Sequence, residues 1–182
     1  MELSNLQKNF PVINQASQEA MELFGPRFTN RPGGHIETDI SAAASVAGLQ
    51  VLRRLAPAVA ALSPGQMMLY PGRAEELEII VKFMAGVCEG LELDPKSGWN
   101  MKKPDNAHAP FYAIPEMERM VEKGFLDICH KYPLEKEYFP FVAIMVAMRL
   151  VYAGKKMQIL DENIGKELAL YHLYAGSTTA PY

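Results

Sequence analysis

The sequence is poor in features that mark several classes of protein. It holds two cysteines in 182 residues, Cys88 and Cys129, too few for the disulfide framework of a small secreted domain. Its longest basic runs are pairs, and the formal net charge is -3 at pH 7. Non-specific nucleic-acid binding rests on clustered Lys and Arg side chains that neutralise phosphates. We therefore expect a cytoplasmic protein that does not bind nucleic acid.

Long apolar runs are also missing. A membrane-spanning helix needs about 20 consecutive apolar residues, whereas the most apolar run, residues 138–148, is shorter, contains Pro140 and is closed by Arg149. This pattern indicates a buried helix, so we expect no membrane span. The first residues lack the apolar region of a secretory signal peptide, and we expect none.

Several catalytic and nucleotide-binding motifs are absent as well. The sequence has no Gly-x-x-x-x-Gly-Lys-Ser/Thr loop and no Gly-x-Gly-x-x-Gly after a strand. It also has no Gly-x-Ser-x-Gly elbow, no Cys-x-x-Cys and no His-Glu-x-x-His. The residues therefore name neither a reaction nor a cofactor.

Apolar residues at helical spacing run through most of the chain, whereas the alternating pattern of strands is missing. Two segments, residues 38–56 and 136–152, are apolar or small on nearly every side. A helix of this kind lies at the centre of a fold. We predict an all-α, single-domain bundle over residues 1–174, with six or seven helices around these two. A frayed tail is expected at residues 175–182.

Some helix boundaries carry specific expectations. Thr38 should cap the first central helix with its hydroxyl, and Pro57 should kink or end that helix. Gly124 leaves open whether the segment after Pro115 forms one helix or two. The last helix is expected over residues 157–174, with Glu162 and Lys166 paired on its solvent-facing side.

The first candidate site is the irregular stretch of residues 27–39. It leads into a helix N-terminus and holds Arg27, Arg31, His35, Glu37 and Asp39. Outward-pointing amides and the helix dipole favour anions there, so the two arginines are candidate ligands for a phosphate or carboxylate. The two acids oppose this interpretation and favour an internal ion-pair cluster that orders the loop.

The second candidate is the aperiodic stretch of residues 94–114, which includes Trp99 and His108. Ordered loops of this length are often lids or binding loops. The aromatic side chains either close over a small molecule, with a lysine steering an anion, or pin the loop to the body of the protein. A metal held by His35, Glu37, Asp39 and His108 is a weaker interpretation, because their spacing matches no recognised metal signature. We predict no metal site.

Two functions from different classes follow from these patterns. The first is a homodimeric helical protein that binds a small ligand or another protein in grooves between helices, with a subunit contact around residues 67–70. The missing catalytic motifs favour it. The second is a small hydrolytic or proton-transfer enzyme whose site combines the 27–39 and 94–114 loops. Contact between those two loops is the feature that separates the hypotheses.

Overall fold

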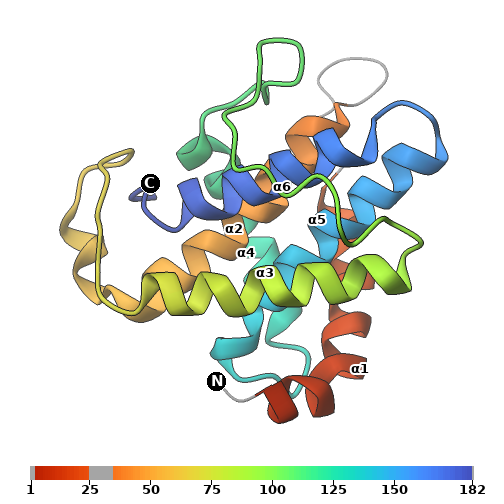
Figure 1. Ribbon diagram of the computed structural model, residues 1–182. Helices are drawn as coiled ribbons and strands as arrows, with labels where there is room; N and C mark the ends of the chain where they lie inside the picture. The colour runs from red at the N-terminus through yellow and green to blue at the C-terminus, as the bar shows by residue number, and fades with distance from the viewer. Residues whose placement is uncertain (1–2, 25–34, 182) are drawn as a thin grey trace.

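The computed structural model describes residues 3–24 and 35–181. Within those ranges the chain forms six α-helices and no strand (Figure 1), which confirms the all-α prediction. The α-helices are α1 (Leu3–Ala20), α2 (Ile36–Leu55), α3 (Arg73–Gly90), α4 (Ile114–Cys129), α5 (Phe139–Lys156) and α6 (Glu162–Gly176). The same described ranges hold three 3-10 segments: η1 (Met21–Leu23), η3 (Pro57–Ala61) and η4 (Lys136–Tyr138).

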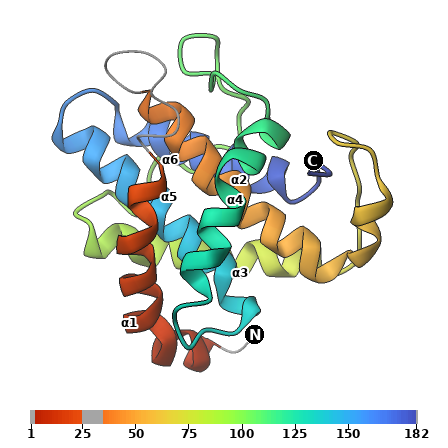
Figure 2. The ribbon, with the colours of Figure 1, turned by 180° about the vertical axis from the view of Figure 1, so that it is seen from behind.

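The centre of the bundle is formed by α2 and α5, as the two apolar segments predict. Every α2 residue from Thr38 to Leu52 is buried, and α5 is buried along most of its length. The other helices surround this pair: α6 packs across α2, α3 crosses one side, and α1 and α4 lie side by side on the opposite side (Figure 2).

Two glycines allow α2 and α6 to cross in backbone contact. A Cβ atom on Gly48 would lie 2.3 Å from the carbonyl oxygen of Leu173, and one on Gly176 would lie 2.3 Å from that of Ser45. Real Cβ atoms do not approach carbonyl oxygens so closely, because the van der Waals contact is far longer. The small residues of α2 therefore allow the backbone of α6 to approach closely at this crossing.

Helix boundaries differ from the expectations at the start of α2. The helix begins at Ile36, so Thr38 lies inside its first turn, and the expectation that Thr38 caps the helix is wrong. His35 is the N-cap residue, and its carbonyl accepts hydrogen bonds from the amides of Thr38 and Asp39. At the other end α2 stops before Pro57. In α4, Gly124 does not split the helix.

The last helix begins later than its apolar stripe predicts. Gln158 takes a left-handed backbone conformation with φ of 57°, which interrupts the helical conformation between α5 and α6. The carboxylate of Asp161 then accepts hydrogen bonds from the amides of Asn163 and Ile164. Because this capping satisfies amides that a longer helix would use internally, α6 starts at Glu162.

The expected fraying of the C-terminal tail is wrong for residues 177–180. Thr178 and Ala180 are buried. The amide of Met68 donates to the carbonyl of Thr178 at 2.8 Å, and that of Ala180 donates to the carbonyl of Gln66 at 2.8 Å. The tail is thus fixed against the connection between η3 and α3, beside which the C-terminus lies in Figure 1.

One described helical stretch, Lys136–Lys156, is long and apolar enough to cross a membrane, with a mean hydropathy of 1.3. Its most apolar part is 78% buried against the other helices. Central helices of compact bundles share this composition.

Candidate functional site

The two irregular stretches meet at the start of α2. The ring of Phe111 stacks on that of His35, with centroids 3.8 Å apart. The backbone amide of Phe111 donates to Thr38 Oγ1 at 3.0 Å, and His108 Nδ1 lies 3.2 Å from Glu37 Oε1. The contact between the two loops, which the enzyme hypothesis requires, is therefore present, and it is made by residues 35–38 and 108–111.

Glu37 lies between two imidazoles. His35 Nε2 is 3.6 Å from its carboxylate, and His108 approaches from the other loop. His35 Nδ1 is 2.8 Å from Thr38 Oγ1. The tautomer with its proton on Nε2 satisfies both contacts of His35, since the Thr38 hydroxyl then donates to Nδ1 while Nε2–H faces the carboxylate. The orientation of both rings is thus set by α2.

Asp39 is the most unusual group here. It is only 6% exposed, and its Oδ1 atom has no hydrogen-bond partner among the described residues. Burial raises the pKa of Asp39 to about 7, because the charged form loses hydration without gaining a counter-charge. A buried carboxyl oxygen without a partner costs free energy, so its presence needs a reason other than stability.

The reason suggested by the geometry is a cavity of about 400 Å³, the Asp39 cavity, for which Asp39 forms part of the wall. His35 and Glu37 are the other polar residues that line it. Its apolar side comes from α2, α5 and the turn after α5, with the residues Ile36, Leu150, Ala153, Met157 and Ile159. Met157 is 59% and Ile159 58% exposed, so apolar surface continues to the mouth.

Two of the other predicted site residues lie outside the described part of the chain, and Trp99 does not line this cavity. Arg27 and Arg31, the candidate anion ligands, lie outside the described residues. Trp99 is half-buried elsewhere: its indole N–H donates to the carbonyl of Pro95 at 2.7 Å, and the ammonium of Lys166 lies 5.8 Å from its ring centroid. The contact with Lys166 of α6 and the packing of Trp99 against the core pin the loop to the body of the protein, which is the second interpretation of its aromatic residues.

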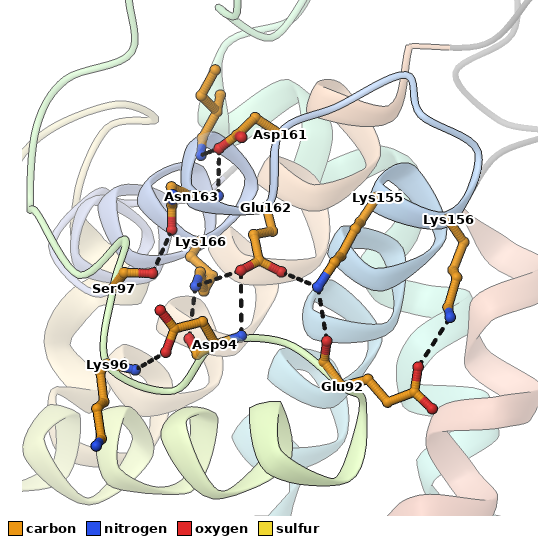
Figure 3. Close-up of polar contacts among 11 residues, drawn as sticks. Glu92, Asp94, Lys96, Ser97, Lys155, Lys156, Asp161, Glu162, Asn163 and Lys166 are labelled. Carbon is orange, nitrogen blue, oxygen red and sulfur yellow. Dashed lines mark hydrogen bonds and ion pairs between the residues drawn. The ribbon is translucent and has the colours of Figure 1, made fainter.

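Lys166 anchors a network of ion pairs between the segment after α3, the end of α5 and the start of α6 (Figure 3). Its ammonium donates to the carbonyl of Asp94 at 2.8 Å and lies 3.8 Å from Glu162, which also pairs with Lys155. The predicted pair of Glu162 and Lys166 is present, but its placement on the solvent-facing side is wrong, because the Lys166 side chain is 0% exposed. Trp99 and the Asp94 segment cover it.

A second buried carboxyl, Glu118 of α4, was not found from the sequence. It is 0% exposed, and neither carboxyl oxygen has a hydrogen-bond partner among the described residues. Burial raises its pKa well above the usual range, and the neighbouring Glu122 raises it further. The helical spacing of Glu118 with the buried Val121 and Phe125 is the signal that could have revealed it.

The remaining titratable candidates are packed residues. Cys88 and Cys129 are free and buried, and burial raises their pKa values to about 11 and about 12, which disfavours the nucleophilic thiolate. His172 donates from Nδ1 to the carbonyl of Leu168 at 2.9 Å, and burial lowers its pKa to about 4. Over the described residues, no three His, Cys, Asp or Glu side chains are placed to hold a metal ion.

Comparison with known proteins adds no relative: no family model, curated protein or solved structure matches the chain.

Proposed function

We propose that this protein binds a small organic cation, an amine that carries an apolar group, in the Asp39 cavity. The observation that carries the proposal is the buried carboxyl of Asp39 in the cavity wall, whose Oδ1 atom has no hydrogen-bond partner among the described residues. An ammonium group would supply the hydrogen-bond donors and the positive charge that this carboxyl lacks.

The rest of the cavity is complementary to such a ligand. Glu37 adds a second acidic side chain to the lining, only 13% exposed and in contact with the two imidazoles. The apolar lining residues Leu150, Ala153 and Met157 would contact the apolar part of the amine. Small-molecule sites commonly combine an apolar lining with a few convergent polar groups in this way.

The proposal is tested with two probes of nearly the same shape, 2-phenylethylamine and the neutral 2-phenylethanol, by isothermal titration calorimetry. We expect the amine to bind at least about tenfold more tightly than the alcohol, because only the amine pairs with the carboxyl. Asp39→Asn should remove that preference. Glu89→Gln, at an exposed acid of α3 outside the cavity, should keep it. Equal affinities for both probes, or an unchanged preference in Asp39→Asn, would contradict the proposal.

A second candidate function, a hydrolytic or proton-transfer enzyme, is favoured by one observation. The Nδ1–H group of His108 donates to Glu37, the arrangement by which a carboxylate orients a general base. His108 also lines a pocket of about 200 Å³ with Lys102, Lys103 and Glu167. Hydrolysis of 4-nitrophenyl acetate that is lost in His108→Gln but kept in Asp39→Asn would support the enzyme; no loss in His108→Gln would exclude this role.

We further propose that the chain forms a homodimer through the connection before α3. Met67 is 74% and Leu69 78% exposed, whereas Met68 and Tyr70 pack inward. Large apolar side chains gathered on one surface are typical of subunit contacts. The double variant Met67→Glu, Leu69→Glu should sediment as a monomer, and Met101→Glu, at another exposed methionine, should remain a dimer. A wild-type protein that sediments as a monomer would refute the contact.

A further inference from the structure

A groove separate from the Asp39 cavity runs between α1 and α3. It consists of two adjoining hollows of about 480 Å³ and about 260 Å³. Both hollows are lined by Phe10, Gly86 and Val87, so they form one continuous groove. Its walls are mainly apolar: Phe10 is 42% exposed, and its ring meets that of Phe83 edge-on at 6.2 Å.

The groove is open because α3 carries a glycine where a side chain would fill it. A Cβ atom on Gly86 would meet nothing within 4 Å. Glycine in a helix interior costs roughly 0.5–1 kcal/mol relative to alanine, and no described neighbour approaches closely enough to require it. The space above Gly86 is thus left free at the expense of helix stability, as a site that admits a ligand against the helix backbone requires.

The inner end of the groove holds an uncompensated positive charge. The half-buried guanidinium of Arg149 donates from Nε to Ser17 Oγ at 3.2 Å and from Nη2 to Asn14 Oδ1 at 2.6 Å. Both acceptors are neutral. Burial alone lowers the pKa of Arg149, and no carboxylate of residues 3–24 or 35–181 contributes to that shift. At the outer end Lys82 is already paired with Glu78 at 2.6 Å. The charge of Arg149 therefore lies beside the apolar surface of the smaller hollow, of about 260 Å³.

We propose that this groove binds a small carboxylate with a medium-length alkyl chain, its carboxylate on Arg149 and its chain along Phe10, Gly86 and Val87. The carboxylate supplies the counter-charge that Arg149 lacks, and guanidinium–carboxylate contacts are strong because they are charge-assisted and often bidentate. The alkyl chain covers apolar surface that water otherwise contacts.

The test uses octanoate and 1-octanol as probes in titration calorimetry. Octanoate should bind the wild-type protein at least about tenfold more tightly than octanol, because only octanoate has a carboxylate that can pair with the guanidinium of Arg149. Gly86→Leu should abolish binding by filling the groove, and it should fold, because a Cβ there meets nothing and leucine is a good helix former. Ala74→Leu adds the same side chain to an exposed position of α3 outside the groove and should bind octanoate as the wild type does.

Arg149→Gln separates charge from shape. It should weaken octanoate binding about tenfold and leave octanol binding unchanged, with far-UV circular dichroism confirming the fold. Octanoate binding that survives Gly86→Leu, or equal affinities for the two probes, would overturn the proposal. So would a wild-type dimer that Gly86→Leu dissociates and octanoate leaves intact, because the occupant would then be a second copy of the chain.

Discussion

Gly48→Ala is expected to destabilise the protein by about 3 kcal/mol or more. The added carbon would lie 2.3 Å from the carbonyl oxygen of Leu173 and 2.5 Å from the amide nitrogen of Ser177, both of which are backbone atoms. A backbone cannot rotate away as a side chain can, so α2 and α6 must separate. Their separation would also disturb the start of α2, where the Asp39 cavity is built.

Gly86→Ala provides the matched control. It makes the same change inside a helix, at a position where a Cβ meets nothing within 4 Å, and it should stabilise the protein by roughly 0.5–1 kcal/mol. Urea unfolding of both variants, followed by circular dichroism, measures the difference. A Gly48→Ala variant as stable as Gly86→Ala would show that α2 and α6 do not cross in backbone contact.

The second large effect is a dependence of stability on pH. The free energy of unfolding should fall as the pH rises from about 5 to about 8. Asp39 has a folded pKa of about 7 against a usual value of 3.8, and the pKa of Glu118 is raised well above 4.5. The folded chain therefore holds protons on both groups where the unfolded chain has lost them. Their stabilising contribution is full below the usual values and is lost as pH rises through the folded ones.

His172 acts in the opposite direction over part of this range. Its pKa is lowered from 6.5 to about 4, so its contribution is present above 6.5 and is lost as the pH falls toward 4. Because one histidine acts against two carboxyls, the free energy of unfolding should still be higher at acidic pH than at neutral pH. Between about pH 6.5 and pH 7 His172 no longer opposes the carboxyls, so stability should decline most steeply there; above about pH 7 the contribution of Asp39 is complete and Glu118 alone continues the decline.

Glu118→Gln tests this account, because it keeps the shape of the side chain and removes its titration. The variant should exceed the wild type in unfolding free energy by roughly 1–3 kcal/mol at about pH 8 and differ little at about pH 4.5. Glu89→Gln, at an exposed position, should match the wild type at both. Urea titrations at the two pH values measure this, and a constant offset between Glu118→Gln and the wild type would contradict a titrating Glu118.

The helices could be predicted from the sequence because apolar periodicity and punctuation by Pro and Gly are local signals. Residues 41–48 predicted a buried α2 from small side chains alone, and the α2–α6 crossing at Gly48 uses them as the pattern implies. The start of α6 was misplaced because the apolar stripe continues through Ile159 and Leu160, while the break depends on the capping geometry of Asp161. The tail after α6 is ordered by distant partners at residues 65–68.

The candidate site could be predicted only in part. The sequence marks His35 and Glu37 as polar residues near a helix start and His108 as a residue of the long 94–114 loop, and the fold brings the three together. The apolar wall of the Asp39 cavity comes from residues more than a hundred positions away, such as Leu150 and Met157, and no local pattern shows that they face Asp39. Trp99 was grouped with His108 because they share a loop, but it packs against Lys166.

The most direct test of the central claim is the affinity of 2-phenylethylamine for the wild-type protein as a function of pH. The ammonium of the ligand stays protonated to about pH 9, as aliphatic amines do, whereas Asp39 must ionise to pair with it. Affinity should therefore rise about tenfold or more between about pH 5.5 and about pH 8, with the change centred near the Asp39 pKa of about 7. Asp39→Asn, which retains His35, Glu37 and His108, should show weak binding with a flatter profile. A wild-type affinity that is constant with pH, or that increases toward acid, would contradict the assignment of the Asp39 cavity to an organic cation.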